Sequence, residues 1–283
     1  MKNISVIIPT LSNEKGLNKL LKDIFELDLT GIALQIILID NSPSDYKSKL
    51  LQIYKKKEIN IQMVYLPQKT NLGFAEAANL GAQNAKQECD WLWFLNDDIE
   101  IFDKNIILSL IKKADQHNWS AITPILQKVD GRIENIGYTI LPEGKALLNF
   151  DKNVYQSSSS NIFSKNNLAG ITAACLLIKK NVFEKIGGFD NSFFAYLEDV
   201  DLFLRMKRKG YNFGVAINSK VVHHHRSTSK KMGCFKQKQD FKNWWKLIWK
   251  NWTIKEKIVF LPRILIERGR NLWGIVKRGR WYN

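Results

Sequence analysis

Two adjacent aspartates, Asp97 and Asp98, follow Asn96 at the end of an uncharged aromatic and aliphatic run, Trp91–Leu95. Such a run is typical of a strand buried on both faces of a parallel sheet. Carboxylates at its end are costly unless a cation meets them. Because ligands bind at the carboxyl ends of strands in open α/β sheets, these acids could hold a metal ion on a phosphorylated ligand. A plain turn explains the same residues, since Asn and Asp favour turns.

A second acidic cluster, Glu198, Asp199 and Asp201, follows an aromatic segment at 193–196. On a helix that begins near Glu198, these acids point to different faces. Asp201 can pair with Arg205 four residues on, which is a structural role. An acidic first turn also suits the helix dipole, so the cluster could be structural throughout. We interpret Asp201 as structural and Asp199 as functional.

The elements that must position these acids alternate along the first hundred residues. Apolar runs predict strands at 4–8, 35–39, 61–66 and 91–95, and helical spacing predicts helices at 17–25, 47–57 and 75–85. This alternation predicts an α/β fold with a doubly wound, mainly parallel, Rossmann-like sheet. The polar segments 10–14, 40–42 and 96–98 each follow a strand, so we expect them to cluster along one sheet edge.

One of these segments begins with Asp40, whose carboxylate could accept hydrogen bonds from a ribose hydroxyl or a base N–H. A simple Asx turn over 40–43 is the alternative. The sequence contains neither the glycine fingerprint of dinucleotide-binding folds nor a Walker phosphate loop, which argues against a dehydrogenase or a P-loop nucleotidase.

The second half of the chain is less regular. We expect a helix at 104–113, strands at 122–129 and 133–140 around an Asp130-Gly131 turn, and a serine-rich loop over 142–167. A strand at 173–178, a short helix ending at Gly187-Gly188 and a strand at 211–217 follow. Three histidines, His223–His225, come after that strand.

The net charge of +16 implies an anionic partner, and it is concentrated at the C-terminal end. Residues 230–283 hold fifteen Lys or Arg and three acids, which accounts for +12 of the total. A tryptophan-rich helical stripe beside lysines predicts a helix at an anionic lipid surface; the stripe comprises Phe241, Trp245, Ile248, Trp249 and Trp252. The alternative is that the stripe packs on the rest of the protein. We expect Pro262 to break the helical pattern, and we expect no nucleic-acid partner.

Taken together, these segments resemble family 2 of the glycosyltransferases, most closely the rhamnosyltransferase-like members of bacterial polysaccharide pathways. The resemblance covers roughly residues 4–228, and its specificity lies in the ordered set of motifs. The motifs are Asn71-Leu72-Gly73-Phe74-Ala75, Leu95-Asn96-Asp97-Asp98, Gly187-Gly188-Phe189-Asp190, Phe193-Phe194, Tyr196, Glu198-Asp199-Val200-Asp201-Leu202 and Val222-His223. The resemblance implies a GT-A fold and an inverting sugar transfer from a UDP- or dTDP-sugar to a hydroxyl of a saccharide or lipid-linked acceptor.

The resemblance also implies roles for individual residues. Asp199, beside Glu198, would be the general base, and Asp98 with His223 would bind Mg²⁺ or Mn²⁺ on the diphosphate. The nucleotide and donor would be bound by Pro9, Thr10, Asn13, Glu14, Asp40, Asn41, Asn71, Gly73, Asn79, Asn96, Asp97 and Gly170. Two departures from the family pattern matter: Asn96 stands where the metal motif has an acid, and His224 or His225 could replace His223.

The predicted organisation is a catalytic domain at 1–228 and a basic helical tail at 229–283. The nucleotide would lie on about 1–100 and the acceptor on about 101–228. We expect a cytoplasmic enzyme, peripheral at the inner face of the cell membrane through residues 241–283. The alternatives are a sugar nucleotidyltransferase, for which residues 9–16 lack the required Gly- and Arg-bearing loop, and a non-catalytic basic binding module. The latter leaves the strand-end acids unexplained.

Overall fold

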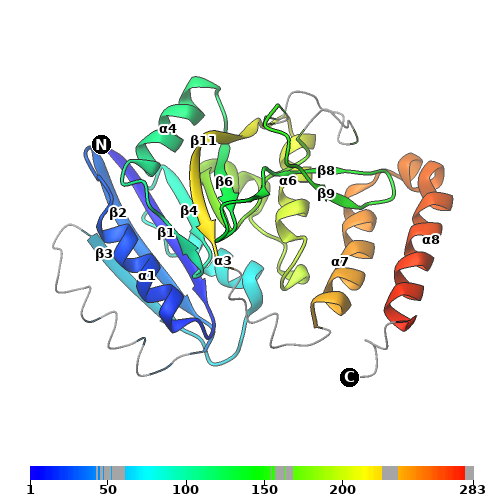
Figure 1. The fold of residues 1–283 in the computed structure, drawn as a ribbon, viewed down its shortest axis with the longest axis horizontal. Coiled ribbons are helices and arrows are strands. Elements are labelled where there is room, and N and C mark those ends of the chain that lie inside the picture. The colour runs from blue at the N-terminus through cyan, green and yellow to red at the C-terminus, as the bar shows by residue number, and fades with distance from the viewer. Residues whose placement is uncertain are drawn as a thin grey trace.

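The computed structural model describes residues 1–42, 44, 47, 52, 61–153, 155, 156, 163, 168–224 and 235–277, without the side chains of 235–237 and 275–277. Nine strands form one mixed sheet, in the order β3-β2-β1-β4-β10-β6-β11-β5 with β7 on β6. Helices lie on both sides of this sheet, and two long helices end the described chain (Figure 1). The predicted α/β fold with a C-terminal helical region is confirmed.

The N-terminal half is the parallel part of the sheet. Its strands are β1 (Lys2–Thr10), β2 (Ile32–Asp40), β3 (Ile61–Pro67) and β4 (Trp91–Leu95), and its helices are α1 (Glu14–Phe25) and α3 (Gly73–Gln83). β1 pairs in parallel with both β2 and β4, and β2 pairs in parallel with β3. The carboxyl ends of β1, β2 and β4 therefore meet at one edge, as the sequence predicted. The helix expected at 47–57 lies outside the described residues, apart from Lys47 and Gln52.

Both faces of this sheet are buried, which explains the uncharged strands. In β4, Trp91, Trp93 and Leu95 join one core cluster with α1 and α4 (Ile106–Gln116), whereas Leu92 and Phe94 join a second cluster. The second cluster holds side chains from α3, α5 (Lys180–Ile186) and α6 (Glu198–Arg208). Successive strand side chains point to opposite faces, so only a strand covered on both sides is apolar throughout.

The C-terminal half of the sheet is mostly antiparallel. Its strands are β5 (Ile99–Glu100), β6 (Ala121–Gln127), β7 (Ile133–Asn135), β10 (Cys175–Lys179) and β11 (Phe213–His223). β10 runs antiparallel to β4 and β6, while β11 runs parallel to β6. The turn at Asp130-Gly131 joins β6 and β7 as a hairpin, as predicted.

Two predictions in this half are wrong in detail. The strand expected at 133–140 is divided: β7 pairs with β6, whereas β8 (Tyr138–Ile140) pairs with β9 (Ala146–Leu148) in a separate two-stranded sheet. β9 lies within the segment predicted as a loop. Gly137, at φ +76°, separates β7 from β8, a conformation that suits glycine.

The tail forms two helices, α7 (Phe235–Asn251) and α8 (Ile254–Lys277). Pro262 lies inside α8, so the expected break at Pro262 is wrong. The break lies instead at Trp252-Thr253, where Thr253 caps α8. The Thr253 hydroxyl accepts from the Glu256 N–H at 3.2 Å, and the Glu256 carboxylate accepts from the Thr253 N–H at 2.6 Å. This reciprocal pair is a capping box, which fixes the start of a new helix.

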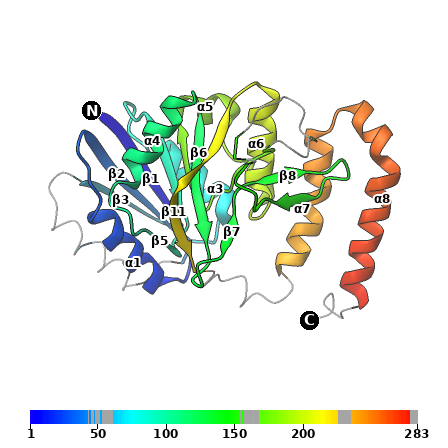
Figure 2. The ribbon, with the colours of Figure 1, turned by 45° about the horizontal axis from the view of Figure 1, so that its top comes forward.

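α7 packs against α6, and α8 lies on the outer side of α7 (Figure 1, Figure 2). Leu247 and Ile248 of α7, and Trp252 just after it, join a third core cluster with Tyr138 of β8 and Phe193. Phe193 lies in the short 3₁₀ helix η1 (Asn191–Phe193). The stripe predicted to face lipid is therefore divided, because Ile248 and Trp252 are buried. Within the described ranges, no helix combines the length and the apolar character needed to cross a bilayer.

Candidate active site at the carboxyl ends of the strands

Asp97 and Asp98 follow β4 but face different partners. Asp97 accepts a hydrogen bond from the Thr10 hydroxyl at 2.6 Å and one from the Asn13 amide at 3.2 Å. The same amide donates to the Asp97 carbonyl at 3.0 Å. Burial raises the pKa of the Asp97 carboxyl to about 6, against the opposing effect of these hydrogen bonds. Asp97 thus ties the loop after β1 to the end of β4.

Asp98 faces His223, the last residue of β11. The Asp98 Oδ1 and His223 Nε2 atoms are 3.1 Å apart, and His223 Nδ1 is 3.1 Å from Glu134 Oε1 on β7. Burial alone would lower the pKa of His223, but hydrogen bonds to Asp98 and Glu134 and their charges raise it to about 9. Glu134 orients the ring by binding one nitrogen, so the other nitrogen faces Asp98.

This pair fits a divalent cation. A carboxylate oxygen and an imidazole nitrogen 3.1 Å apart can both reach one ion that replaces the proton on His223. No cluster of three or more His, Cys, Asp or Glu side chains suited to a metal occurs in the described part of the chain. The remaining ligands would have to be water and phosphate oxygens, which is the usual arrangement for Mg²⁺ at phosphate sites.

The sequence left the choice among three histidines open. His224 pairs with Glu100 at 2.6 Å, and Glu100 also contacts Lys19 at 3.0 Å. His225 lies outside the described residues. Lys19, Glu100 and His224 line a small hollow of about 270 Å³ together with Asp98. His223 is thus the described histidine whose side chain contacts the Asp98 carboxylate, whereas His224 donates its backbone N–H to the Asp98 carbonyl at 3.0 Å.

Asp199 reaches the same sheet edge from α6. Its carboxylate accepts from the N–H of Ala173 at 3.3 Å and from that of Val200 at 2.8 Å. Ala173 stands just before β10, and the neighbouring Ala174 carbonyl accepts from the Asn96 N–H at 2.9 Å. Two hydrogen bonds through Ala173 and Ala174 therefore connect Asp199 to the residue that precedes Asp97 and Asp98.

Glu198 and Asp199 have different environments although they are adjacent. Glu198 is buried, and its Oε2 has no hydrogen-bond partner. Burial, together with the charge of Asp199, raises the pKa of Glu198 to about 8, and burial raises that of Asp199 to about 6. Burial therefore favours a proton on this pair, and the two backbone N–H donors of Ala173 and Val200 favour the ionised form of Asp199.

The loop before this pair is strained. Phe194, Tyr196 and Leu197 have φ values of 61°, 69° and 68°, which are unfavourable for side chains other than glycine. Asn243 of α7 holds the loop: its amide donates to the carbonyls of Phe193, Ala195 and Tyr196 at 2.9, 2.8 and 2.7 Å. The C-terminal tail, through α7, thus contacts the loop at 193–196 that precedes Glu198 and Asp199.

The predicted nucleotide residues lie around the ends of β1 and β2. Pro9 pairs with Ile39, and Glu14 accepts from the Ser44 hydroxyl at 2.7 Å. Asp40 is fully buried and accepts from Lys47 at 2.6 Å and from the Tyr65 hydroxyl at 2.8 Å. A ligand would have to compete with these partners, so the nucleotide role of Asp40 stays a prediction.

Asn41, Asn71 and Gly73 shape the loop before α3. Asn41 accepts from the Leu72 N–H at 3.2 Å, and Asn71 accepts from the Gly73 N–H at 2.9 Å. Gly73 has φ +77°, and a Cβ there would lie 2.5 Å from the Phe194 carbonyl oxygen. Glycine is therefore required where this loop meets the strained segment.

Two predicted donor residues have structural contacts. Asn79 bridges α3 to the chain at 189–191: it donates to the Phe189 carbonyl at 2.7 Å and accepts from the Phe189 N–H at 2.9 Å. Gly170 lies beside Tyr138, whose hydroxyl would be 2.1 Å from an added Cβ. Their donor-binding roles stay predictions.

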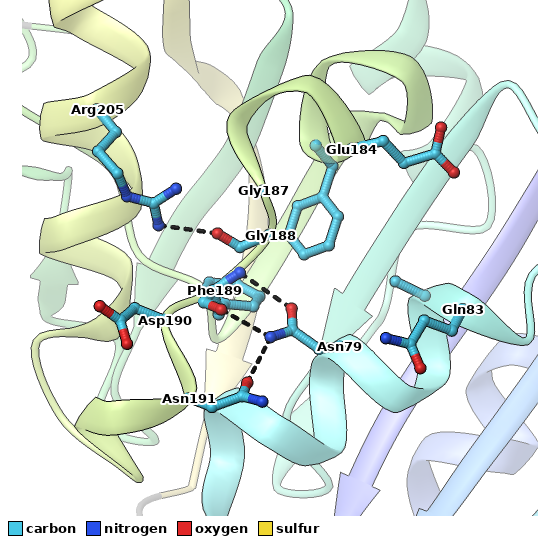
Figure 3. Close-up of a pocket in the computed structure, with 11 residues that line it drawn as sticks. Asn79, Gln83, Glu184, Gly187, Gly188, Phe189, Asp190, Asn191 and Arg205 are labelled. Atoms are coloured by element: carbon cyan, nitrogen blue, oxygen red, sulfur yellow. Dashed lines mark hydrogen bonds between the residues drawn. The ribbon is translucent and has the colours of Figure 1, made fainter.

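A hollow of about 680 Å³ elsewhere on the protein is lined by none of the candidate acids. Figure 3 shows it between Asn79 on α3, Glu184 on α5 and Arg205 on α6, with the Asn79 amide turned toward Phe189 and Asn191. Arg205 reaches the Gly188 carbonyl at 2.8 Å and pairs with Asp201 at 2.7 Å, which confirms the predicted structural pair. Asn79 binds Asn191, and Arg205 binds two backbone carbonyls, so these side chains are engaged in structural contacts and the hollow is a poor candidate for the chemistry.

Sequence reasoning missed two residues of the site, Glu134 and Asn243. Glu134 lies on a three-residue strand, 89 positions from the histidine it contacts, so no spacing pattern connects them. Asn243 stands among lysines and tryptophans in the tail. Asn243 is 1% exposed, but the sequence carries no signal of this burial, which depends on how α7 packs.

Known proteins share this architecture. Residues 5–187 match the family model described as glycosyl transferase family 2, and residues 154–227 match one described as the N-terminal domain of galactosyltransferase. Among solved structures, the mannosyltransferase PcManGT from Pyrobaculum calidifontis, in complex with GDP-Man and Mn²⁺, aligns with 97% of this chain and 75% of its own at a TM-score of 0.63 and 13% identity. S. aureus TarS 1-349 in complex with UDP-GlcNAc aligns with 94% of this chain and 72% of its own, at a TM-score of 0.65 and 15% identity. These alignments support the GT-A fold.

Three curated relatives show the range of chain lengths. The uncharacterized protein y4gI of Sinorhizobium fredii is 25% identical over 94% of this chain, and the O-antigen biosynthesis protein RfbC of Myxococcus xanthus is 23% identical over 78%. The chain spans only 29% and 17% of those proteins. The rhamnosyltransferase WbbL of Escherichia coli is 22% identical over 95% of this chain and 96% of its own length. Since the family model matches well over half of the residues, the chain belongs to glycosyl transferase family 2.

Proposed function

We propose that the protein transfers a sugar, with inversion, from a nucleoside-diphosphate donor to a hydroxyl of a saccharide or lipid-linked acceptor in cell-surface polysaccharide synthesis. The observation that carries the proposal is the meeting of two unlike acidic groups at one sheet edge. Asp98 is paired with His223 at 3.1 Å, and Asp199 is bound to Ala173 beside the Asn96–Ala174 hydrogen bond. The donor is a UDP- or dTDP-sugar.

The first group would stabilise the leaving diphosphate. A divalent cation, Mg²⁺ or Mn²⁺, supplies positive charge to the diphosphate oxygens when bound. Asp98 and His223 would hold it, and Glu134 keeps the His223 ring in the required orientation. Asp97 would act indirectly, because it fixes Thr10 and Asn13 beside the nucleotide.

The second group would activate the acceptor. Asp199 accepts hydrogen bonds from the N–H groups of Ala173 and Val200, which favour its ionised form, so it would remove the proton from an incoming hydroxyl. The new bond forms on the face of the anomeric carbon opposite the leaving oxygen, and the configuration inverts. The buried Glu198 keeps its proton, which prevents two adjacent charges from facing the acceptor.

We further propose the predicted division of labour along the chain. Residues 1–228 form the catalytic domain, with the nucleotide on about 1–100 and the acceptor on about 101–228. Residues 229–283 are a basic tail that keeps the enzyme at the inner face of the cell membrane. A lipid-linked acceptor would be presented at such a surface.

The test is the variant Asp199→Asn. Thermal stabilisation by UDP-, dTDP- and GDP-sugars, with and without Mn²⁺, first identifies the donor. Turnover of the variant is then assayed with that donor. We expect the variant to keep the donor-induced rise in Tm and to lose turnover by about 10²- to 10⁴-fold. The control is Asp201→Asn on the same helix, whose carboxylate pairs with Arg205. It should lower Tm but keep most of the turnover. Full turnover by Asp199→Asn would refute the proposal.

A further inference from the structure

α8 carries an apolar surface that the described residues of the protein leave uncovered. Five aliphatic side chains spaced by three, four or seven residues form one line along the helix. They are Ile254, Ile258, Leu261, Leu265 and Leu272, which are 77, 69, 49, 53 and 42% exposed. Val259, Ile266 and Trp273 widen the line on one side at 59, 58 and 70%. We call these eight residues the α8 face.

The opposite side of α8 anchors it to α7. Ile264 is 2% exposed in the third core cluster, where Phe260 also packs. The Arg268 guanidinium lies 3.0 Å from the centre of the Trp244 ring. Because the inner side is already buried against α7, the α8 face is a second apolar surface and cannot be explained by packing within the described chain. Contiguous exposed apolar surface of this kind marks an interaction site.

The charges around the α8 face select its partner. Residues 235–277 hold eleven Lys or Arg and three acids. Arg263 and Arg270 fall on the helical flank next to Val259 and Ile266, since positions three, four or seven apart share a side. A second copy of this chain would bring two such positive tails together, which opposes association. Anionic lipid headgroups would neutralise them while the acyl region covers the aliphatic side chains.

We propose that the α8 face is a membrane-docking surface that lies in the headgroup region of an anionic bilayer. It deepens the proposed function, and rests on it only for the lipid-linked acceptor that such a bilayer would carry. The sequence placed the lipid contact within residues 241–283 and on the Trp-rich stripe of 241–252 in particular. Two members of that stripe, Ile248 and Trp252, are buried, whereas Trp249 is 76% exposed beside α8.

Docking through α8 would also orient the active site. α7 lies between α8 and α6 (Figure 2), and Asn243 of α7 holds the loop that leads into Glu198 and Asp199. The helix that would rest on the bilayer is therefore joined, through one packed helix, to the acceptor side of the site. This arrangement suits an acceptor whose lipid stays in the same membrane.

The test is co-sedimentation of the full chain with vesicles of phosphatidylcholine alone or mixed equally with phosphatidylglycerol. The variant Ile258→Asn, Leu265→Asn, Leu272→Asn should bind the mixed vesicles at least tenfold more weakly than the parent chain. Its matched control is Phe102→Asn, Val129→Asn, Leu148→Asn, which removes three side chains exposed by 67, 68 and 51% outside the tail. The control should sediment like the parent. Arg263→Gln, Arg270→Gln should weaken binding to the mixed vesicles and leave the low binding to neutral vesicles unchanged.

A second measurement does not depend on how the triple variant folds. Brominated lipids should quench tryptophan fluorescence of the parent chain, and Trp249→Phe, Trp273→Phe should remove most of that quenching. Equal sedimentation of the α8 variant and its control would overturn the proposal. So would a dimer in analytical ultracentrifugation that the α8 variant abolishes, because the face would then bind a second copy. Sedimentation involves no sugar transfer, so failure of the proposed sugar transfer would leave these results unaffected.

Discussion

At the residue scale, neighbouring acids in this protein have different tasks because the backbone turns them to different sides. Asp97 binds Thr10 and Asn13 of the loop after β1, whereas Asp98 faces His223 at the end of β11. Asn96 stands where the family motif has an acid. In the proposed site, the Asp98–His223 pair would supply the oxygen and nitrogen ligands without it.

Asp98→Asn tests this assignment against Asp97→Asn. Removing the Asp98 carboxylate should abolish the Mn²⁺-dependent part of the thermal stabilisation by a nucleoside diphosphate, since a neutral amide is a much weaker ligand for a hard cation. Asp97→Asn should instead lower Tm without ligand, because Thr10 and Asn13 lose a charged acceptor, at a cost of about 1–3 kcal/mol. Differential scanning fluorimetry with and without Mn²⁺ measures both effects. The same Mn²⁺ response in both variants would contradict the assignment of Asp98 as a metal ligand.

At the element scale, α7 belongs to the site although it lies in the tail. Three residues with left-handed φ precede the acidic pair, and such a loop persists only where its surroundings hold it. Asn243 satisfies three of its carbonyls, and Asn251 donates to Asp201 at 2.7 Å. Two asparagines eight residues apart thus fix both the loop and the first turn of α6.

Asn243→Leu should therefore impair catalysis more than binding. The substitution keeps the branched shape but removes the donor of the Ala195 and Tyr196 carbonyls, at about 1–3 kcal/mol for each buried unpaired group. The Phe193 carbonyl still accepts from the Ala195 N–H. We expect a lower Tm and at least a tenfold fall in kcat, with an unchanged Kd for the nucleotide by calorimetry. The control is Asn271→Leu on α8, whose amide donates only to the Glu267 carbonyl of its own helix. If both variants reduced kcat equally, Asn243 would have no positioning role.

At the scale of the whole molecule, buried acids make global stability depend on pH. The pKa of Glu198 is raised by burial and by the charge of Asp199, from 4.5 to about 8. The folded state therefore keeps a proton that the unfolded chain releases above its own pKa near 4.5. Since the native state binds more protons in this window, the contribution of Glu198 makes the protein less stable as pH rises from about 4.5 to 8.

Glu198→Gln should remove this dependence. Gln keeps the shape but cannot ionise, so the variant should gain Tm over the parent chain as pH rises from 5 to 8. One kcal/mol corresponds to roughly 2–4 °C in a large domain, and we expect a gain of at least that size at pH 8. Glu184→Gln is the control, because the Glu184 side chain is 61% exposed and pairs only with Lys180. A Tm difference between Glu198→Gln and the parent that stays constant across this range would disprove the role of burial.

The local elements and the family were predictable from the sequence because both depend on local patterns. Uncharged runs such as Trp91–Leu95 identify strands covered on both faces, and strand-helix alternation fixes the parallel half of the sheet. The motifs around Asp98, Glu198 and His223 are short and ordered, so they identified the family. The Asp201–Arg205 pair followed from a spacing of four on one helix.

Only the tertiary structure decided which distant groups meet. Glu134 reaches His223 because β7 and β11 both pair with β6, and Asn243 reaches the loop before Glu198 because α7 packs on α6. The sequence likewise placed the apolar tryptophans of the tail on one stripe, but packing buried Trp252 and left Trp249 outside. Periodicity shows which side chains share a face of one helix. What covers that face depends on contacts between segments far apart in the chain, which no local pattern contains.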